Sequence, residues 1–95
     1  MRFEWDEAKD LRNRRKHGLS FARARRLFDS DAYLDIYDSM HSDSEDRFLA
    51  IGSIDDVVVV VVYTEPEDGV IRILSARLAN DREARLFLRH GARDQ

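Results

Sequence analysis

The amino-acid sequence predicts an α+β fold in which a helical hairpin and a C-terminal helix pack on an antiparallel β-sheet. Three features support this prediction: two capped helical segments near the N-terminus, four consecutive β-type segments separated by turn signals, and a capped helical segment at the end. A chain of 95 residues buries one modest core. We therefore treat residues 1–95 as a single domain.

The N-terminal segments predict a short strand followed by the first helix. Residues 3–5 favour a strand, and Asp6 offers a carboxylate that caps a helix running to about Lys16. Gly18 suits the left-handed position that ends such a helix. The three-residue spacing of apolar residues predicts a narrow stripe that faces the core, formed by Trp5, Ala8 and Leu11.

The second arm of the hairpin is predicted over residues 21–28, after an N-cap at Ser20. Its apolar face would carry Phe21, Ala24 and Phe28, while the arginines between them project away from the core.

Residues 32–38, 47–53, 57–64 and 70–77 are predicted to be strands of an antiparallel meander. The six consecutive valines in the third of them predict a central strand buried on both faces. Residues 54–57 indicate a tight hairpin turn, and residues 65–69 a longer hairpin loop containing Pro66 and Gly69. Asn80 and Glu83 form a capping box at the start of the last helix, residues 81–90.

The charges are unevenly distributed. The net charge is −3, yet basic residues crowd residues 9–26 and acidic residues fill the middle of the chain. The basic segment could bind an anion or could be a solvated helix face. The chain has no cysteine, which excludes disulfides and thiol catalysis, and its apolar runs are too short to span a bilayer. We expect a soluble, cytoplasmic protein.

Three histidines are candidates for moving a proton at neutral pH. His90 lies near the C-terminus and His41 lies in a polar loop, so His17 is the best-placed candidate. Lys9, earlier on the same helix, is an alternative cation. The structural alternative for His17 is that it ends the helix beside Gly18 and interacts with the helix dipole.

Arginine is suited to hold phosphate oxygens, because its planar fork donates two hydrogen bonds and keeps its charge. Arg72 and Arg77 lie on the fourth predicted strand at positions of opposite parity, so a functional pair would need a β-bulge. We favour Arg77 as a phosphate clamp, and expect Arg72 to pair with Glu45 or Asp46. Cross-strand salt bridges are the alternative role for both arginines.

Cofactor binding is not expected. The sequence contains no phosphate-binding glycine loop and no dinucleotide fingerprint. A metal site formed by Asp38, His41, Asp43 and Glu45 is conceivable, but their spacing matches no regular metal-binding loop.

Seven segments resemble, in order, the BrnT family of type II toxin–antitoxin systems: "FEWDEAK", "NRRKHGLSF", "LFDS", "EDRFLAIG", "VVVVYT", "IRILSAR" and "REARLF". The resemblance implies a RelE-like ribonuclease fold, inhibition of translation by RNA cleavage, and neutralisation by a small DNA-binding antitoxin of the BrnA type. The chain departs from the family where Phe87 stands for a tyrosine and Asn80 for a threonine, and in its acidic balance.

We therefore expect a metal-independent endoribonuclease toxin whose catalytic residues are Arg77, Arg72, His17 and Lys9. The residues expected to bind RNA are Arg12, Arg15, Lys16, Arg25 and Arg26.

Two alternatives remain at this stage. One is a toxin-like binding module that has little activity and acts through its antitoxin in a hetero-oligomer, favoured by Phe87 and the acidic middle. The other is a DNA-binding subunit, but no recognition-helix pattern supports it, and DNA contact is expected only through the antitoxin.

Overall fold

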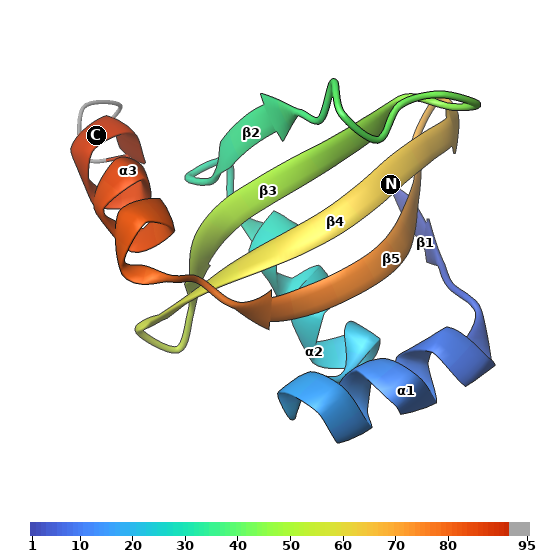
Figure 1. Ribbon diagram of the computed structural model, residues 1–95, viewed down its shortest axis with the longest axis horizontal. Helices are drawn as coiled ribbons and strands as arrows, with labels where there is room; N and C mark the ends of the chain where they lie inside the picture. The colour runs from blue at the N-terminus through green and yellow to red at the C-terminus, as the bar shows by residue number, and fades with distance from the viewer. Residues whose placement is uncertain (92–95) are drawn as a thin grey trace.

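The computed structural model describes residues 1–91 and consists of a twisted five-stranded sheet with helices against it (Figure 1). The predicted α+β class is confirmed. No helix in this part of the chain is long and apolar enough to cross a membrane. The elements are β1 (Arg2–Glu4), α1 (Glu7–His17), α2 (Phe21–Ala24), the 3₁₀ helix η1 (Arg25–Asp29), β2 (Leu34–Tyr37), β3 (Arg47–Ile54), β4 (Val57–Glu67), β5 (Val70–Leu78) and α3 (Asp81–Gly91).

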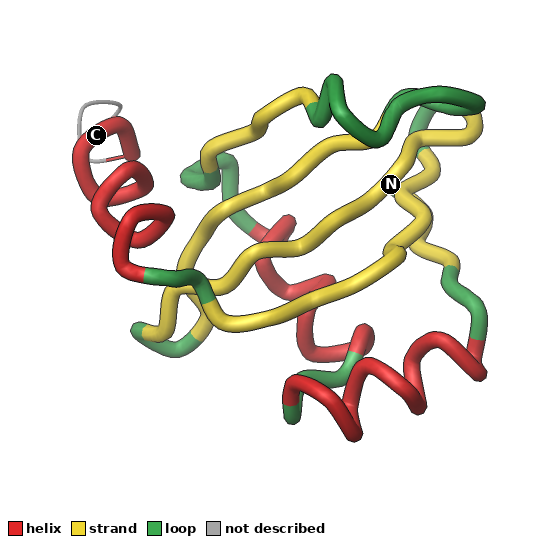
Figure 2. Tube along the Cα trace, in the orientation of Figure 1, coloured by secondary structure: helices red, strands yellow, loops and turns green. Residues whose placement is uncertain are grey.

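The strands lie in the order β1-β5-β4-β3-β2 (Figure 2). Strands β2 to β5 form the predicted antiparallel meander, with the valine-rich β4 at its centre. Strand β1 is not part of this meander. It forms the edge of the sheet opposite β2 and pairs parallel with β5. The helices between β1 and β2 provide the crossover that a parallel pair requires.

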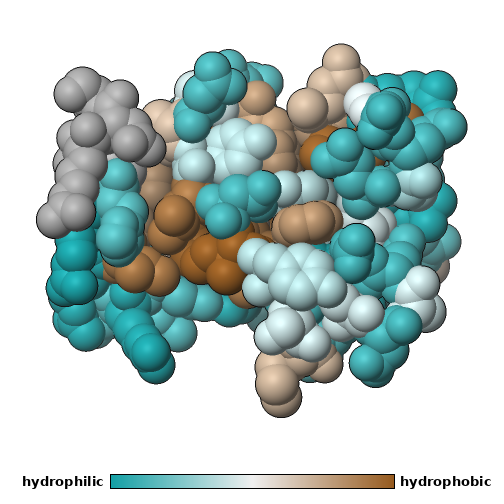
Figure 3. Space-filling view, turned by 90° about the horizontal axis from the view of Figure 1, so that it is seen from above, coloured by the Kyte–Doolittle hydropathy of each residue, from teal (hydrophilic) through white to brown (hydrophobic). Residues whose placement is uncertain are grey.

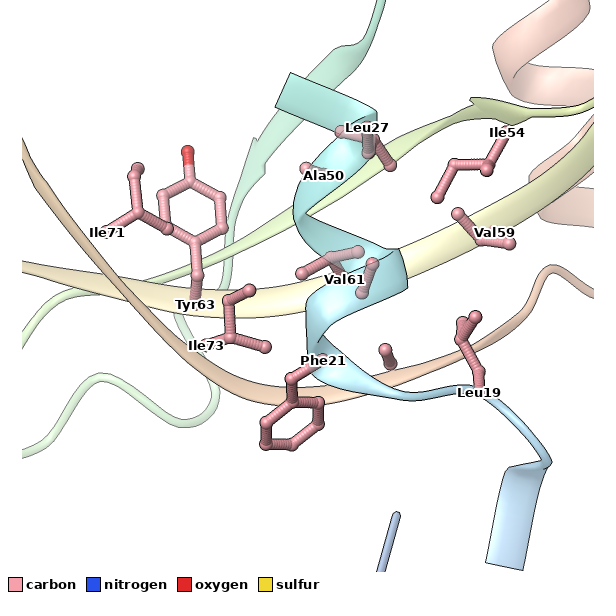
Figure 4. Close-up of a cluster of buried hydrophobic side chains, with 12 residues drawn as sticks. Leu19, Phe21, Leu27, Ala50, Ile54, Val59, Val61, Tyr63, Ile71 and Ile73 are labelled. Atoms are coloured by element: carbon pink, nitrogen blue, oxygen red, sulfur yellow. The ribbon is translucent and has the colours of Figure 1, made fainter. Parts of the chain in front are cut away.

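The core lies between the sheet and the segment formed by α2 and η1. Phe21 and Leu27 from this segment pack on Ala50, Val61 and Ile73 of three neighbouring strands (Figure 4). All five residues are buried. This face of the sheet is called the core face below, and the opposite one the open face.

The predicted second helix is shorter than expected. Ser20 accepts a hydrogen bond from the Arg23 amide as predicted, but the α-helical part ends at Ala24 and continues as 3₁₀ helix. Phe21, Ala24 and Leu27 are the buried residues of this segment. Their spacing of three matches the period of a 3₁₀ helix, which keeps all of them facing the sheet.

Of the apolar stripe predicted for the first helix, only Trp5, which lies just before α1, packs against the core. Ala8 and Leu11 are exposed, and the buried residues of the helix are Asp10 and Asn13. The Asp10 carboxylate accepts the Phe21 amide proton at 2.8 Å. The Asn13 side chain donates to the carbonyls of Leu19 and Ala76, both at 2.8 Å, and accepts from the Ala76 amide at 3.1 Å.

Asn13 therefore pairs with β5 as a neighbouring strand would. Strand β1 covers the edge of β5 only from Val70 to Arg72, which leaves the Ala76 backbone groups at an edge without a strand partner. The primary amide of Asn13 satisfies both groups. This arrangement holds α1 along the edge of the sheet beside β5, as Figure 1 shows.

The two hairpin connections differ in how well they were predicted. The tight turn between β3 and β4 is confirmed, with Asp55 and Asp56 both at positive φ, as a two-residue hairpin requires. The prediction of a longer loop at residues 65–69 is wrong. Strand β4 extends to Glu67, a register shift accommodates Pro66, and the chain reverses around Asp68 and Gly69.

Helix α3 starts with the predicted capping box. The Asn80 side chain accepts from the Glu83 amide at 2.8 Å, and the Glu83 carboxylate accepts from the Asn80 amide at 2.9 Å. The helix contacts β2 and β3 at one end of the sheet. In the view from above, apolar side chains gather between α3 and β2 (Figure 3).

We expect Asn13→Ala to lower the free energy of unfolding by about 2 to 4 kcal/mol, because it leaves buried backbone groups of Leu19 and Ala76 unpaired. Urea denaturation measures this difference. Arg15→Ala, at an exposed position of the same helix, is the matched control and should change stability by less than about 0.5 kcal/mol. Equal effects of the two substitutions would contradict the role given to Asn13.

Candidate functional site

Two adjoining hollows of about 370 Å³ each lie between α1 and the open face of the sheet. They share Lys9, Leu74 and Ser75, so we treat them as one groove and call it the α1 groove. Its remaining lining residues are Arg12, Asn13, Lys16 and His17 on α1, Leu49 and Val62 on the sheet, and Asp38, His41 and Arg47 on the far side.

The α1 wall of the groove is positively charged. Lys9, Arg12 and Lys16 are exposed, and none of them forms an ion pair with another residue in the range 1–91. Several other arginines of the chain are neutralised, for example Arg2 by Glu67 and Arg26 by Asp55. The structure therefore leaves uncompensated positive charge on one side of this groove.

The floor of the groove contains a β-bulge. The register between β4 and β5 pairs Val62 with Ser75 and Tyr63 with Ile73, so Leu74 is an extra residue. Leu74 and Ser75 consequently both line the groove.

The same bulge brings Arg72 and Arg77 to one face. Ile73 and Ala76 both lie in the buried core although they are three residues apart. Arg72 precedes Ile73 and Arg77 follows Ala76, so both arginines lie on the open face. The bulge is the feature that a functional pair of these two arginines was expected to need.

Neither of these arginines lines the α1 groove. Arg72 pairs with Glu4 on the neighbouring β1 at 2.7 Å, which corrects the predicted pairing with Glu45 or Asp46. Arg77 donates two hydrogen bonds to Glu83, at 2.7 and 2.8 Å. Their phosphate-holding role stays a prediction, and the carboxylates of Glu4 and Glu83 would compete with a phosphate for these guanidinium groups.

The remaining predicted RNA-binding residues lie in different places. Arg15 is exposed on α1 but does not line the groove. Arg25 stacks over the Phe3 ring at 4.5 Å from its centroid, and Arg26 holds the Asp55 carboxylate in the turn between β3 and β4. Arg25 and Arg26 therefore belong to the segment on the core side of the sheet.

His17 lies at the end of α1, where Gly18 adopts φ 71° and its amide donates to the Arg14 carbonyl. This geometry fits the helix-ending role considered for His17. The residue also lies between two hollows, because it lines both the α1 groove and an apolar hollow with Leu19, Ile54 and Leu78.

The far side of the groove carries residues that are not among the predicted catalytic ones. His41 Nδ1 lies 2.9 Å from Asp38 Oδ2, in the loop between β2 and β3. Arg47 begins β3 beside them. The sequence offered one signal for this group, a histidine three residues after an aspartate, but only the fold shows that it faces Lys9 and Ser75 across the groove.

The metal site considered for this loop is not assembled. No group of three or more histidine or acidic side chains within residues 1–91 is arranged to hold a metal ion.

The ion pair between Arg77 and Glu83 shifts the titration of both groups. The hydrogen bonds from Arg77 lower the pKa of Glu83 below its ordinary value of 4.5, and those to Glu83 raise the pKa of Arg77. Because Glu83 also completes the capping box of α3, this ion pair joins β5 to the start of the helix.

The architecture and the groove together define a small α+β domain with a cation-lined open sheet face. A family model described as "Ribonuclease toxin, BrnT, of type II toxin-antitoxin system" matches residues 5–83, and the chain belongs to this BrnT toxin family. The crystal structure of the Brucella abortus ribonuclease toxin BrnT is similar, with a TM-score of 0.69 and 25% sequence identity. The similarity covers 85% of this chain and 99% of that one. No curated protein sequence matches the chain.

We expect Glu83→Gln to destabilise the protein at neutral pH and to have a decreasing effect in acid. Because folding lowers the pKa of Glu83, its stabilising contribution is fully present above 4.5 and is lost as the pH falls through the lowered value. Urea denaturation at a series of pH values tests this. Glu45→Gln, in an exposed loop, should show no such dependence, and parallel curves for Glu83→Gln and wild type would contradict the account.

Proposed function

We propose that this chain is a RelE-like toxin that inhibits translation by cleaving RNA in the α1 groove without a metal ion, and that a BrnA-like antitoxin neutralises it. The membership in a ribonuclease toxin family supports RNA as the substrate. A type II toxin has an antitoxin partner, and contact with DNA would come through that partner.

The observation that carries this proposal is the set of unpaired cations on α1 beside the groove. RNA presents a phosphate at every nucleotide, and lysine and arginine side chains without carboxylate partners bind such phosphates. Lys9, Arg12 and Lys16 form no ion pair within the described part of the chain. Several other arginines already form ion pairs with acidic side chains.

The chemistry requires a base for the ribose 2′-hydroxyl and cations that stabilise the charge developing on the phosphate. Two histidines line the groove, His17 on the α1 side and His41 on the far side. Lys9 lines both halves of the groove, which supports a contact between its ammonium group and the reacting phosphate. The proposal needs no cofactor.

Cleavage of end-labelled RNA by the purified chain in EDTA tests the reaction. We expect products with cyclic phosphate ends from the wild-type protein, and a cleavage rate lowered about 10-fold or more by Lys9→Ala. Arg2→Ala removes a cation outside the groove and is the control. Undiminished RNA binding without cleavage would favour the binding-module alternative instead.

The salt dependence of RNA binding tests the α1 wall separately from the chemistry. Each lost phosphate contact reduces the slope of log K against log salt by about 0.7 for a single strand. We expect this reduction for Lys16→Ala but not for Arg2→Ala, measured with an RNA whose 2′-hydroxyls are replaced so that it is not cleaved. A wild-type slope for Lys16→Ala would exclude Lys16 from the binding surface.

A further inference from the structure

We propose that His41, oriented by Asp38, is the general base that removes the proton from the attacking 2′-hydroxyl. This inference rests on the proposed ribonuclease function and identifies a catalytic residue within the α1 groove. It assigns to His41 the proton transfer that the sequence suggested for His17.

The first argument is the hydrogen bond between the two side chains. His41 Nδ1 lies 2.9 Å from Asp38 Oδ2, and an ionised carboxylate at this distance accepts the Nδ1 proton. The neutral ring then keeps its lone pair on Nε2, the atom a base uses. A histidine with one nitrogen held by a carboxylate and the other free is the arrangement in which an enzyme orients its base.

The loop around this pair is closed by further hydrogen bonds. The Asp38 amide donates to the Arg47 carbonyl at 2.8 Å, and the Arg47 amide donates to Ser42 Oγ at 2.9 Å. Ser42 Oγ in turn donates to the Asp38 carbonyl. The Asp38 side chain is 15% exposed and the His41 side chain 66% exposed, so a fixed carboxylate holds a ring that a ligand can reach.

Arg47 adds a cation beside the base. Its Nε is buried and has no hydrogen-bond partner within residues 1–91, although the residue lines the groove with His41. A buried donor without an acceptor is unfavourable, and the guanidinium that carries it is a cation that can bind a phosphate from the side that lines the groove. Base and cation therefore lie on the same side of the groove, with Lys9 lining it as well.

His17 lacks the features that favour His41. No side chain in residues 1–91 is hydrogen-bonded to the imidazole of His17. A basic residue at the end of α1, beside the C-cap Gly18, is explained by its interaction with the helix dipole. Without an orienting partner, neither ring nitrogen of His17 is assigned as the acceptor.

The proposed step is an internal transesterification. His41 Nε2 takes the 2′-hydroxyl proton while the 2′-oxygen bonds to phosphorus and the bond from phosphorus to the 5′-oxygen breaks. The Lys9 ammonium donates a proton to the departing 5′-oxygen, and solvent water returns the proton from His41 to Lys9. The products are a 2′,3′-cyclic phosphate and a 5′-hydroxyl.

Steady-state cleavage of a short RNA by His41→Ala tests the assignment. We expect kcat to fall about 100-fold or more, as the loss of a general base does, with KM changed less than about threefold. Added imidazole should restore part of the rate, because it can replace the missing ring. Asp38→Asn should lower kcat without changing KM, since the amide no longer fixes the ring tautomer.

His90→Ala, an exposed histidine on α3, is the control and should cleave at the wild-type rate. If wild type cleaves and His41→Ala cleaves equally well, the assignment of His41 is overturned while the ribonuclease function stands. A loss that imidazole does not restore, with KM raised instead, would also overturn it, because that result indicates a structural role. If the wild-type chain does not cleave RNA at all, both proposals fail.

Discussion

The hydrogen bonds of Asn13 with the backbone of Ala76 determine where α1 lies, and the groove depends on that position. A helix that docked through apolar residues could pack on the core face, where it would cover the sheet together with the segment of α2 and η1. The side-chain amide instead requires a strand edge, because only there are an N–H and a C=O of one residue available together. Helix α1 therefore borders the open face and brings Lys9 and Lys16 to it.

The distribution of ion pairs determines that the groove beside α1 is positively charged. The net charge of −3 argues against a polyanion partner when it is averaged over the surface. Some carboxylates, however, bind arginines away from the groove: Asp55 binds Arg26 at the β3–β4 turn, and Glu83 binds Arg77 at the start of α3. Positive charge without a carboxylate partner is left where α1 meets the sheet, so an acidic protein can still present a phosphate-binding groove.

Local features of the fold could be predicted from the sequence, whereas the contacts that build the site could not. The caps formed by Ser20 and Asn80 act over three residues, so a short segment contains all the information for them. The docking of Asn13 on Ala76 joins residues 63 positions apart, and periodicity suggested an apolar stripe instead. His41 was set aside because a polar loop in a sequence gives no indication of the surface that it faces. The pairing of Arg72 with Glu4 was missed because it depends on the parallel return of β1.

The central claim is that RNA binds between α1 and the loop that carries His41. Amide chemical shifts measured by NMR, with and without a 2′-deoxy analogue that cannot be cleaved, test it most directly. The account predicts shifts in residues 9–17, at Leu74 and Ser75 in the floor, and in residues 38–47. Shifts confined to the segment of α2 and η1, which covers the core face, would contradict it.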